Sequence, residues 1–232
     1  MKKLIFSIII LSISIACTNN SNERATELKI KQDSRTVDSI RRVDSIRTVD
    51  SLSFLARDAW GDAKFGMTEK ETLETDMFKN AYNGNYYTSG SKSLRTTTKI
   101  HNSGKSMNVE AMFFRNRLYE IKLEDWYRTA NYFDTDVTET VEILYDLIKT
   151  KYGKPKTNKG MPSFMRMRPN HYHTAYKWVI GNKTIEIRVD EEYKGSRYRA
   201  TCLIRNEKEY KPVKQYSDSV RKAKEETFVN PF

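Results

Sequence analysis

Residues 116–125 read NRLYEIKLED, and residues 182–191 read NKTIEIRVDE. The two segments align without gaps at an offset of 66 residues, and both alternate apolar with polar or charged side chains after an Asn. This alternation predicts β-strands with one face toward a core and the other toward solvent, and in the first segment it places Tyr119, Ile121 and Leu123 on the core face. Either the segments descend from an old duplication, or they are two unrelated amphipathic strands that each follow an Asn turn.

Further strands are predicted on both sides of these segments. Residues 94–101 are Thr-rich, and residues 107–114 place four apolar side chains at every second position: Met107, Val109, Ala111 and Phe113. Strand signals continue at residues 176–180, 184–189 and 197–205. In the last of these runs one face holds Tyr198, Ala200, Cys202 and Ile204. Cys202 is therefore predicted to be a small buried core residue.

Two helices are predicted, one before each group of strands. Thr68 and Glu71 have the spacing of a capping box, which predicts a short helix from there to about Lys79. Asp136 and Glu139 repeat that spacing before the second helix.

The second helix has the clearest helical pattern in the chain. Apolar side chains recur at helical spacing from Val137 to Tyr152. Gly153 and Pro155 then supply a stop. We therefore predict an α+β domain over residues 57–205, with an antiparallel sheet covered by two helices and built from two αβββ units. Residues 206–232 are expected to form a polar tail with a short helix at residues 217–227.

The first 17 residues predict export. Met1-Lys2-Lys3 precedes 13 mostly apolar residues, Leu4–Ala16, which are too few to span a bilayer but suit a secretory signal. Ser14-Ile15-Ala16-Cys17 resembles the lipobox of bacterial lipoproteins. The resemblance implies cleavage after residue 16 and attachment of membrane lipid to Cys17. Thr18, rather than Asp, after the cysteine suggests the outer membrane, facing the periplasm more than the cell surface. The alternative is a plain signal peptide that leaves Cys17 unmodified.

Residues 17–56 are interpreted as a tether. Residues 35–52 read RTVDSI, RRVDSI and RTVDSL, so apolar side chains fall at every third position. On an α-helix such a stripe winds around the axis, and no continuous apolar face forms. Asp38 and Asp44 precede arginines at helical neighbour spacing. These features predict a solvated, charge-paired helical spacer or, alternatively, a disordered linker.

Three motifs carry a resemblance to a known family. FGMTEKE at residues 65–71, FRNRLYEI at residues 114–121 and KYGKP at residues 151–155 resemble a family of uncharacterised exported lipoproteins of the Bacteroidota type. The hexapeptide repeat is similar to the DSIR-type tethers of such lipoproteins. More loosely, the domain is similar to small lipoproteins of outer-membrane assembly and to the tandem αβββ fold of β-lactamase-inhibitor proteins. The resemblance implies fold and location, and no reaction.

No catalytic motif stands out. Phosphate-binding glycine loops, dinucleotide fingerprints, HExxH and paired-cysteine motifs are absent, and two cysteines exclude a disulfide-dense scaffold. His171 and His173 would share one side of a strand, but two ligands do not make a metal site. No cofactor or metal is therefore expected, and exposed loop histidines are the default interpretation. The alternative is an envelope hydrolase or other enzyme with a dispersed, metal-assisted site that includes Glu191 and Glu192.

Charge indicates a binding surface. The chain carries a formal net charge of +11. Residues 149–168 contain seven basic residues and no acidic one, interleaved with Met and aromatic side chains. A partner is predicted at the long loop that follows the second helix, at Lys154, Lys156, Arg166, Arg168, His171 and Tyr172. The alternative is a solvated basic loop without a partner.

The expected function is that of a non-enzymatic binding or scaffold module of the cell envelope. An exported protein meets lipid phosphates, acidic glycans and acidic proteins rather than nucleic acid. A third class, an inhibitor or a ligand carrier, would be indicated by a deep apolar groove.

Overall fold

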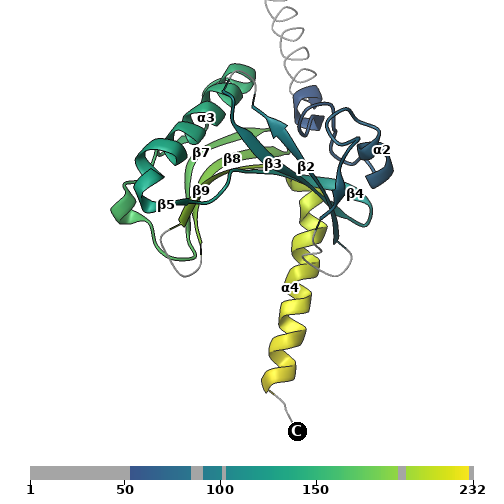
Figure 1. Ribbon diagram of the computed structural model, residues 1–232. Helices are drawn as coiled ribbons and strands as arrows, with labels where there is room; N and C mark the ends of the chain where they lie inside the picture. Colours follow the sequence, from purple (N-terminus) through teal and green to yellow (C-terminus); the bar gives the residue numbers. More distant parts are fainter. Residues whose placement is uncertain (1–52, 85–90, 101–102, 193–196, 230–232) are drawn as a thin grey trace, which may run out of the picture. The chain divides into compact units, whose positions relative to one another are not determined.

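The alternating segments form one antiparallel sheet (Figure 1). The computed structural model describes residues 53–84, 91–100, 103–192 and 197–229, with side chains up to residue 223. The strands are β1 (Tyr82–Asn83), β2 (Ser91–Lys99), β3 (Ser106–Phe114), β4 (Arg117–Glu124), β5 (Arg128–Thr129), β6 (Thr157–Asn158), β7 (Tyr172–Ile180), β8 (Lys183–Glu191) and β9 (Arg197–Asn206). Their order is β1-β2-β3-β4-β9-β8-β7-β6, and β5 also pairs with β9. The prediction of an α+β fold with a large antiparallel sheet is confirmed.

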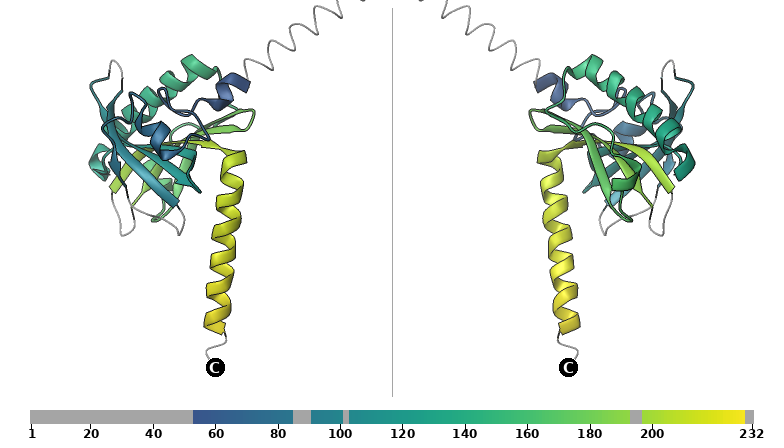
Figure 2. Two further views of the ribbon diagram at one scale, coloured as in Figure 1. Left: turned by 90° about the vertical axis from the view of Figure 1, so that its right-hand side faces the viewer. Right: turned by 90° about the vertical axis from the view of Figure 1, so that its left-hand side faces the viewer.

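Helices lie on both faces of the sheet. The helices are α2 (Glu69–Leu73), α3 (Thr138–Tyr152) and α4 (Glu207–Val229), and residues 53–57 are also helical. In Figures 1 and 2, α2 and α3 lie on one side of the sheet, and α4 extends from the other. No helix among the described residues is long and apolar enough to cross a bilayer. The predicted signal segment, Cys17 and residues 17–52 of the tether lie outside the described residues.

The main core lies between the sheet and α3. Its largest buried side chains come from helices, strands and connections alike: Trp178, Phe78, Phe133, Phe113, Leu144, Leu118 and Ile121. The predicted alternation in β3 is confirmed, because Met107, Val109, Ala111 and Phe113 are all buried in this core. Burial of apolar surface is the main stabilising contribution to such a fold.

The first helix is capped as predicted but is shorter. Thr68 Oγ1 accepts from the Glu71 N–H at 3.2 Å, and the Glu71 carboxylate accepts from the Thr68 N–H at 2.8 Å. The helix ends at Leu73 rather than near Lys79. The Asp62 carboxylate accepts from the Asp76 N–H at 2.7 Å, so this donor is bonded outside a helical ladder.

The second helix ends as predicted but starts differently. Gly153 has φ 75°, which stops the helix. A π-helical turn, Phe133–Val137, leads directly into α3, and no side chain caps its first residue. The prediction that Asp136 caps this helix is wrong, because its carboxylate accepts from Arg128 Nε at 3.1 Å instead.

Because of a β-bulge, Tyr119 lies on the sheet face opposite to the predicted one. The register between β3 and β4 shifts between Met112 and Phe113, which leaves Tyr119 without a partner in β3. Tyr119 thereby turns away from the face of Ile121 and shares a second apolar cluster with Val213 of α4. One extra residue in a strand reverses the alternation from that point on.

The C-terminal helix is longer than predicted and is docked on the sheet. α4 begins directly after β9, ten residues before Ser217. Tyr210 stacks on Tyr119 with ring centroids 5.8 Å apart, and Val213 is buried beside them. The first half of the predicted polar tail therefore belongs to the folded domain.

The two matching sequence segments occupy unequal positions. Residues 116–125 include β4, the last strand of the group that follows α2. Residues 182–191 include β8, the middle strand of the group that follows α3. Both strands follow a hairpin turn and place one apolar face on the core. The two strands share these local demands, and the strand order places β9 rather than β8 beside β4.

Candidate functional site

The predicted binding loop runs along the β7 edge of the sheet. Its first part forms β6, in which Thr157 pairs with Lys177. Its middle forms a short 3-10 turn, η3 (Phe164–Arg166). The Phe164 ring packs edge-on against Phe133 at 5.7 Å and against Tyr198 at 5.5 Å. Both β6 and η3 thus attach the loop to the domain.

The six predicted binding residues do not lie together. Lys154 and Lys156 precede β6, beside the stretch of β7 around Lys177. Arg166, Arg168, His171 and Tyr172 lie at or before the start of β7. Tyr172 and Lys177 are about 17 Å apart along the strand, at about 3.3 Å per residue. Only the second group is compact enough to form a single site.

We call this second group the η3 surface. It consists of Phe164, Met165, Arg166, Arg168, His171 and Tyr172, all of which are exposed. The exposed fraction reaches 86% for Met165 and 58% for Tyr172. Within the described residues, neither Arg166 nor Arg168 takes part in an ion pair. The η3 surface therefore combines unneutralised arginines with accessible apolar side chains.

The two histidines and the two acids of the alternative enzyme site are held by neighbouring groups. His171 Nδ1 lies 3.1 Å from the Pro169 carbonyl, and His173 Nε2 lies 3.1 Å from the Gly160 carbonyl. The Glu191 carboxylate accepts from the Tyr198 hydroxyl at 3.2 Å, and Glu192 pairs with Arg197. The described residues contain no group of three or more His, Cys, Asp or Glu side chains suited to hold a metal ion.

On the sheet face opposite α3, here called the outer face, the charged side chains in the described part of the chain form ion pairs, unlike the arginines of the η3 surface. Opposite charges alternate across β2, β3, β4, β9, β8 and β7, through the ion pairs Arg95–Glu110, Glu110–Lys122, Lys122–Glu124, Glu124–Arg199, Arg199–Asp190, Glu120–Arg205, Glu186–Arg188 and Lys177–Glu186. Burial raises the pKa of the Glu120 carboxyl, and the charge of Arg205 opposes that shift. The charges of this face are largely neutralised by one another.

A buried lysine joins the start of the domain to the sheet. Lys183, at the first position of β8, is 0% exposed. Its ammonium donates to the Leu55 carbonyl at 3.2 Å, the Asp58 carbonyl at 2.7 Å and the Tyr152 hydroxyl at 2.7 Å. Burial lowers the pKa of Lys183 to about 8, and the charge of Lys151 adds to that effect. The three acceptors account for the three N–H donors of the ammonium.

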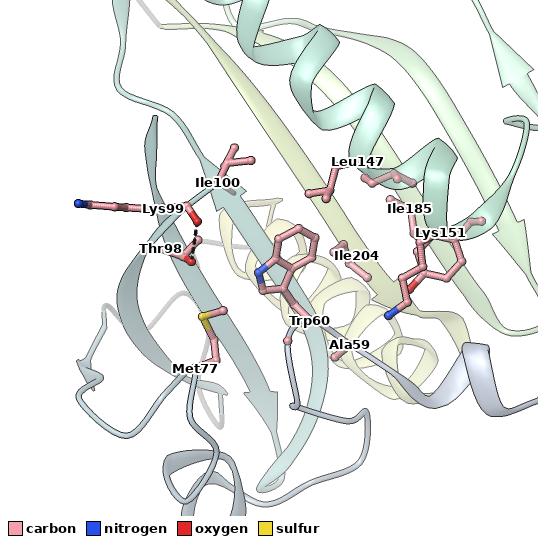
Figure 3. A pocket seen from close by; sticks show the side chains of 13 residues that line it. Ala59, Trp60, Met77, Thr98, Lys99, Ile100, Leu147, Lys151, Ile185 and Ile204 are labelled. Carbon is pink, nitrogen blue, oxygen red and sulfur yellow. Dashed lines mark hydrogen bonds between the residues drawn. The ribbon is translucent and has the colours of Figure 1, made fainter. Parts of the chain in front are cut away.

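A cavity of about 330 Å³ lies between α3 and residues 59–61 (Figure 3), and its lining includes Tyr152, the hydroxyl partner of Lys183. Its walls are mainly apolar: Ala59, Trp60, Met77, Ile100, Leu147, Ile148, Ile185 and Ile204. Sequence reasoning missed this cavity, because its walls come from six separate stretches of the chain. None of these stretches carries a local motif that marks it as part of a site.

Cys202 is buried, as predicted, at 0% exposure, and burial raises the pKa of its thiol to about 12. In a Cys17→Ala chain, Cys202 is the single thiol. We expect it to react with a thiol reagent at neutral pH at least about 1,000-fold more slowly in the native protein than in denaturant. A rise of three pKa units lowers the thiolate fraction by that factor, and burial also blocks access. Labelling kinetics followed by mass spectrometry measure the ratio, and equal rates in both states would contradict the buried position.

Comparison with known proteins returned no match: neither a family model, nor a curated protein, nor a solved structure is similar to this chain at the significance required.

Proposed function

We propose that the protein is a lipid-anchored, non-enzymatic binding module of the bacterial cell envelope. In this proposal Cys17 carries the membrane lipid, the hexapeptide repeat is a spacer, and the domain faces the periplasm from the outer membrane. The lipobox-like sequence before Cys17 and the charge-paired repeat support the anchor and the spacer.

The contrast between two charged surfaces supports the binding role. On the outer face, basic side chains are paired with carboxylates across neighbouring strands. On the η3 surface, Arg166 and Arg168 have no such partner among the described residues and lie beside the exposed Met165. Arginine binds phosphate through two parallel hydrogen bonds, and Met offers adaptable apolar contact. The proposed ligand is the phosphate-bearing surface of an anionic lipid.

Loss of the two arginines tests this assignment. In a full-length chain that carries Cys17→Ala, replacing both Arg166 and Arg168 by Ala should weaken binding to anionic phospholipid vesicles about 30-fold. Each basic residue near such a surface contributes about 1 kcal/mol, so two contribute about 2 kcal/mol. Cosedimentation over a range of vesicle concentrations measures the affinity, which should also fall steeply with added salt.

The matched control lies on α4. Lys208 and Lys211 are exposed, and their replacement by Ala removes the same charge from another surface. Replacing this lysine pair should weaken binding to anionic vesicles clearly less than replacing the arginine pair. Equal losses would mean that only diffuse positive charge acts, and the η3 surface would be abandoned as a site. Tight binding to an acidic protein with no binding to anionic vesicles would replace the lipid by the protein as the ligand.

The same proposal includes an internal symmetry of the fold. We infer that α2 with β2, β3 and β4, and α3 with β7, β8 and β9, are two αβββ units. The order of the sheet supports this, because each group forms a meander and the last strands of both groups, β4 and β9, are neighbours. In this arrangement β9 of the second unit is the equivalent of β4 in the first. The sequence match between β4 and β8 is therefore not evidence for the two units.

A further inference from the structure

The cavity beside α3 has the size and lining of a small-ligand site. Ligand pockets in proteins typically measure about 300–1,000 Å³ and are lined mainly by apolar side chains with a few polar groups. The cavity, at about 330 Å³, lies at the lower end of that range. Trp60 and Leu147 lie on its two sides, and Ile185 and Ile204 of the sheet form its floor (Figure 3).

The charged side chains that line the cavity are all basic. They are Lys99 and Lys151, and the lining includes no carboxylate. The side chain of Lys99 points away from the other labelled side chains in Figure 3, whereas the Lys151 ammonium lies on the side of Ala59. Lys151 is therefore the charged group positioned to meet a ligand.

The polar end of the cavity carries excess positive charge. The Lys151 ammonium is 3.4 Å from the Asp58 carboxylate, which is longer than the 2.7–2.9 Å typical of a charge-assisted hydrogen bond. The Lys183 ammonium donates to the Tyr152 hydroxyl, and Tyr152 itself lines the cavity. The Asp58 carboxylate is paired with Lys151, whereas the Lys183 ammonium bonds backbone and hydroxyl oxygens, so an added anion would be attracted to this end.

We infer that the cavity binds a single-chain amphiphile with an anionic head group. The acyl chain would occupy the apolar space between Trp60 and Leu147, and the head group would bind the Lys151 ammonium. This charge complementarity disfavours a cationic amphiphile, and a neutral head group lacks the charge–charge attraction to Lys151. The site is separate from the η3 surface, so this inference does not depend on the function proposed above.

Decanoate is a suitable first probe. Full-length protein with Cys17→Ala should bind one decanoate per chain, measured by isothermal titration calorimetry at neutral pH below the micelle concentration. Decyltrimethylammonium should bind at least about tenfold more weakly, which corresponds to about 1.4 kcal/mol. Within a series of shorter fatty acids, each added methylene should tighten binding by about fourfold until the cavity is full. Decyl phosphate tests whether a phosphate head group serves equally well.

Two pairs of variants locate the binding. Lys151→Gln should weaken decanoate binding about tenfold and leave decanol unaffected. Lys149→Gln is its control, because Lys149 is exposed on the same helix, lies over the Tyr145 ring and does not line the cavity. Leu147→Trp should fill the cavity and abolish binding, whereas Val179→Trp, at an exposed position on β7 outside the cavity, should not.

Several results would overturn the inference. They are the absence of decanoate binding, equal affinity for decanoate and decyltrimethylammonium, equal loss in both lysine variants, or undiminished binding by a folded Leu147→Trp chain. Thermal unfolding of each variant checks that it is folded. Vesicle binding by the η3 surface is measured separately, so failure of one proposal leaves the other standing.

Discussion

Replacing Cys17 by Ala is expected to move the protein from the membrane fraction to the soluble fraction of a bacterial host that processes lipoproteins. A single acyl chain binds a bilayer only marginally, whereas two or more chains hold a protein stably. Loss of the cysteine should remove all of them at once, because each depends on this residue in the lipoprotein pathway that the lipobox-like sequence resembles. Fractionation with immunodetection measures the distribution, and metabolic labelling with a fatty acid reports the lipid directly.

The control is the other cysteine. Cys202→Ala changes a buried core position and leaves the proposed anchor in place. That variant should remain in the membrane fraction and keep its lipid label. If the Cys17→Ala chain still sediments with membranes after a high-salt wash, the lipid-anchor proposal is wrong.

Trp178→Ala is expected to cause the largest loss of stability among single core substitutions. Trp178 is 2% exposed and packs beside Tyr145, with ring centroids 6.1 Å apart. Its indole N–H donates to the Gly153 carbonyl at 2.8 Å, which ties the end of α3 to β7. Truncating a buried Trp removes its transfer free energy and leaves a cavity, so the free energy of unfolding should fall by about 3–5 kcal/mol. Urea unfolding followed by circular dichroism measures this change.

Two further tryptophan variants separate the causes. Trp178→Phe keeps a buried aromatic ring but loses the hydrogen bond to Gly153, and should cost about 1–2 kcal/mol. Trp126 is 58% exposed, so Trp126→Ala should stay within about 0.5 kcal/mol of the parent. A loss below about 1 kcal/mol for Trp178→Ala would contradict the packing described for this residue.

Local patterns predicted the elements whose cause is local. The apolar side chains of β3 and the buried position of Cys202 follow from alternation along a single strand. The capping box at Thr68 and the stop at Gly153 involve only neighbouring residues. These predictions needed no knowledge of which strand lies beside which.

The wrong predictions share a different cause. Asp136 was expected to cap a helix, but Arg128 binds its carboxylate and the chain upstream is already helical. Tyr119 was expected on the core face, but a bulge against β3 turns it toward α4. In each case a partner outside the local pattern decided the outcome.

The candidate sites show the same division. The excess of basic residues in the loop after α3 is readable in the sequence, and it includes the arginines of the η3 surface. The separation of Lys154 and Lys156 from those arginines cannot be read from the sequence, because it results from the path of the loop along β7.

The α+β class, the faces of most strands and the places where α2 begins and α3 ends can all be predicted from local sequence patterns. The reason is that period-two alternation, capping and glycine stops act over a few residues. The order of the strands, the neutralised outer face and the cavity beside α3 depend instead on how distant parts of the chain pack together. Lys183 shows why: two of its three acceptors, the Leu55 and Asp58 carbonyls, lie more than 120 residues away in the chain. The free energy of such contacts depends on chain segments that meet only in the folded protein.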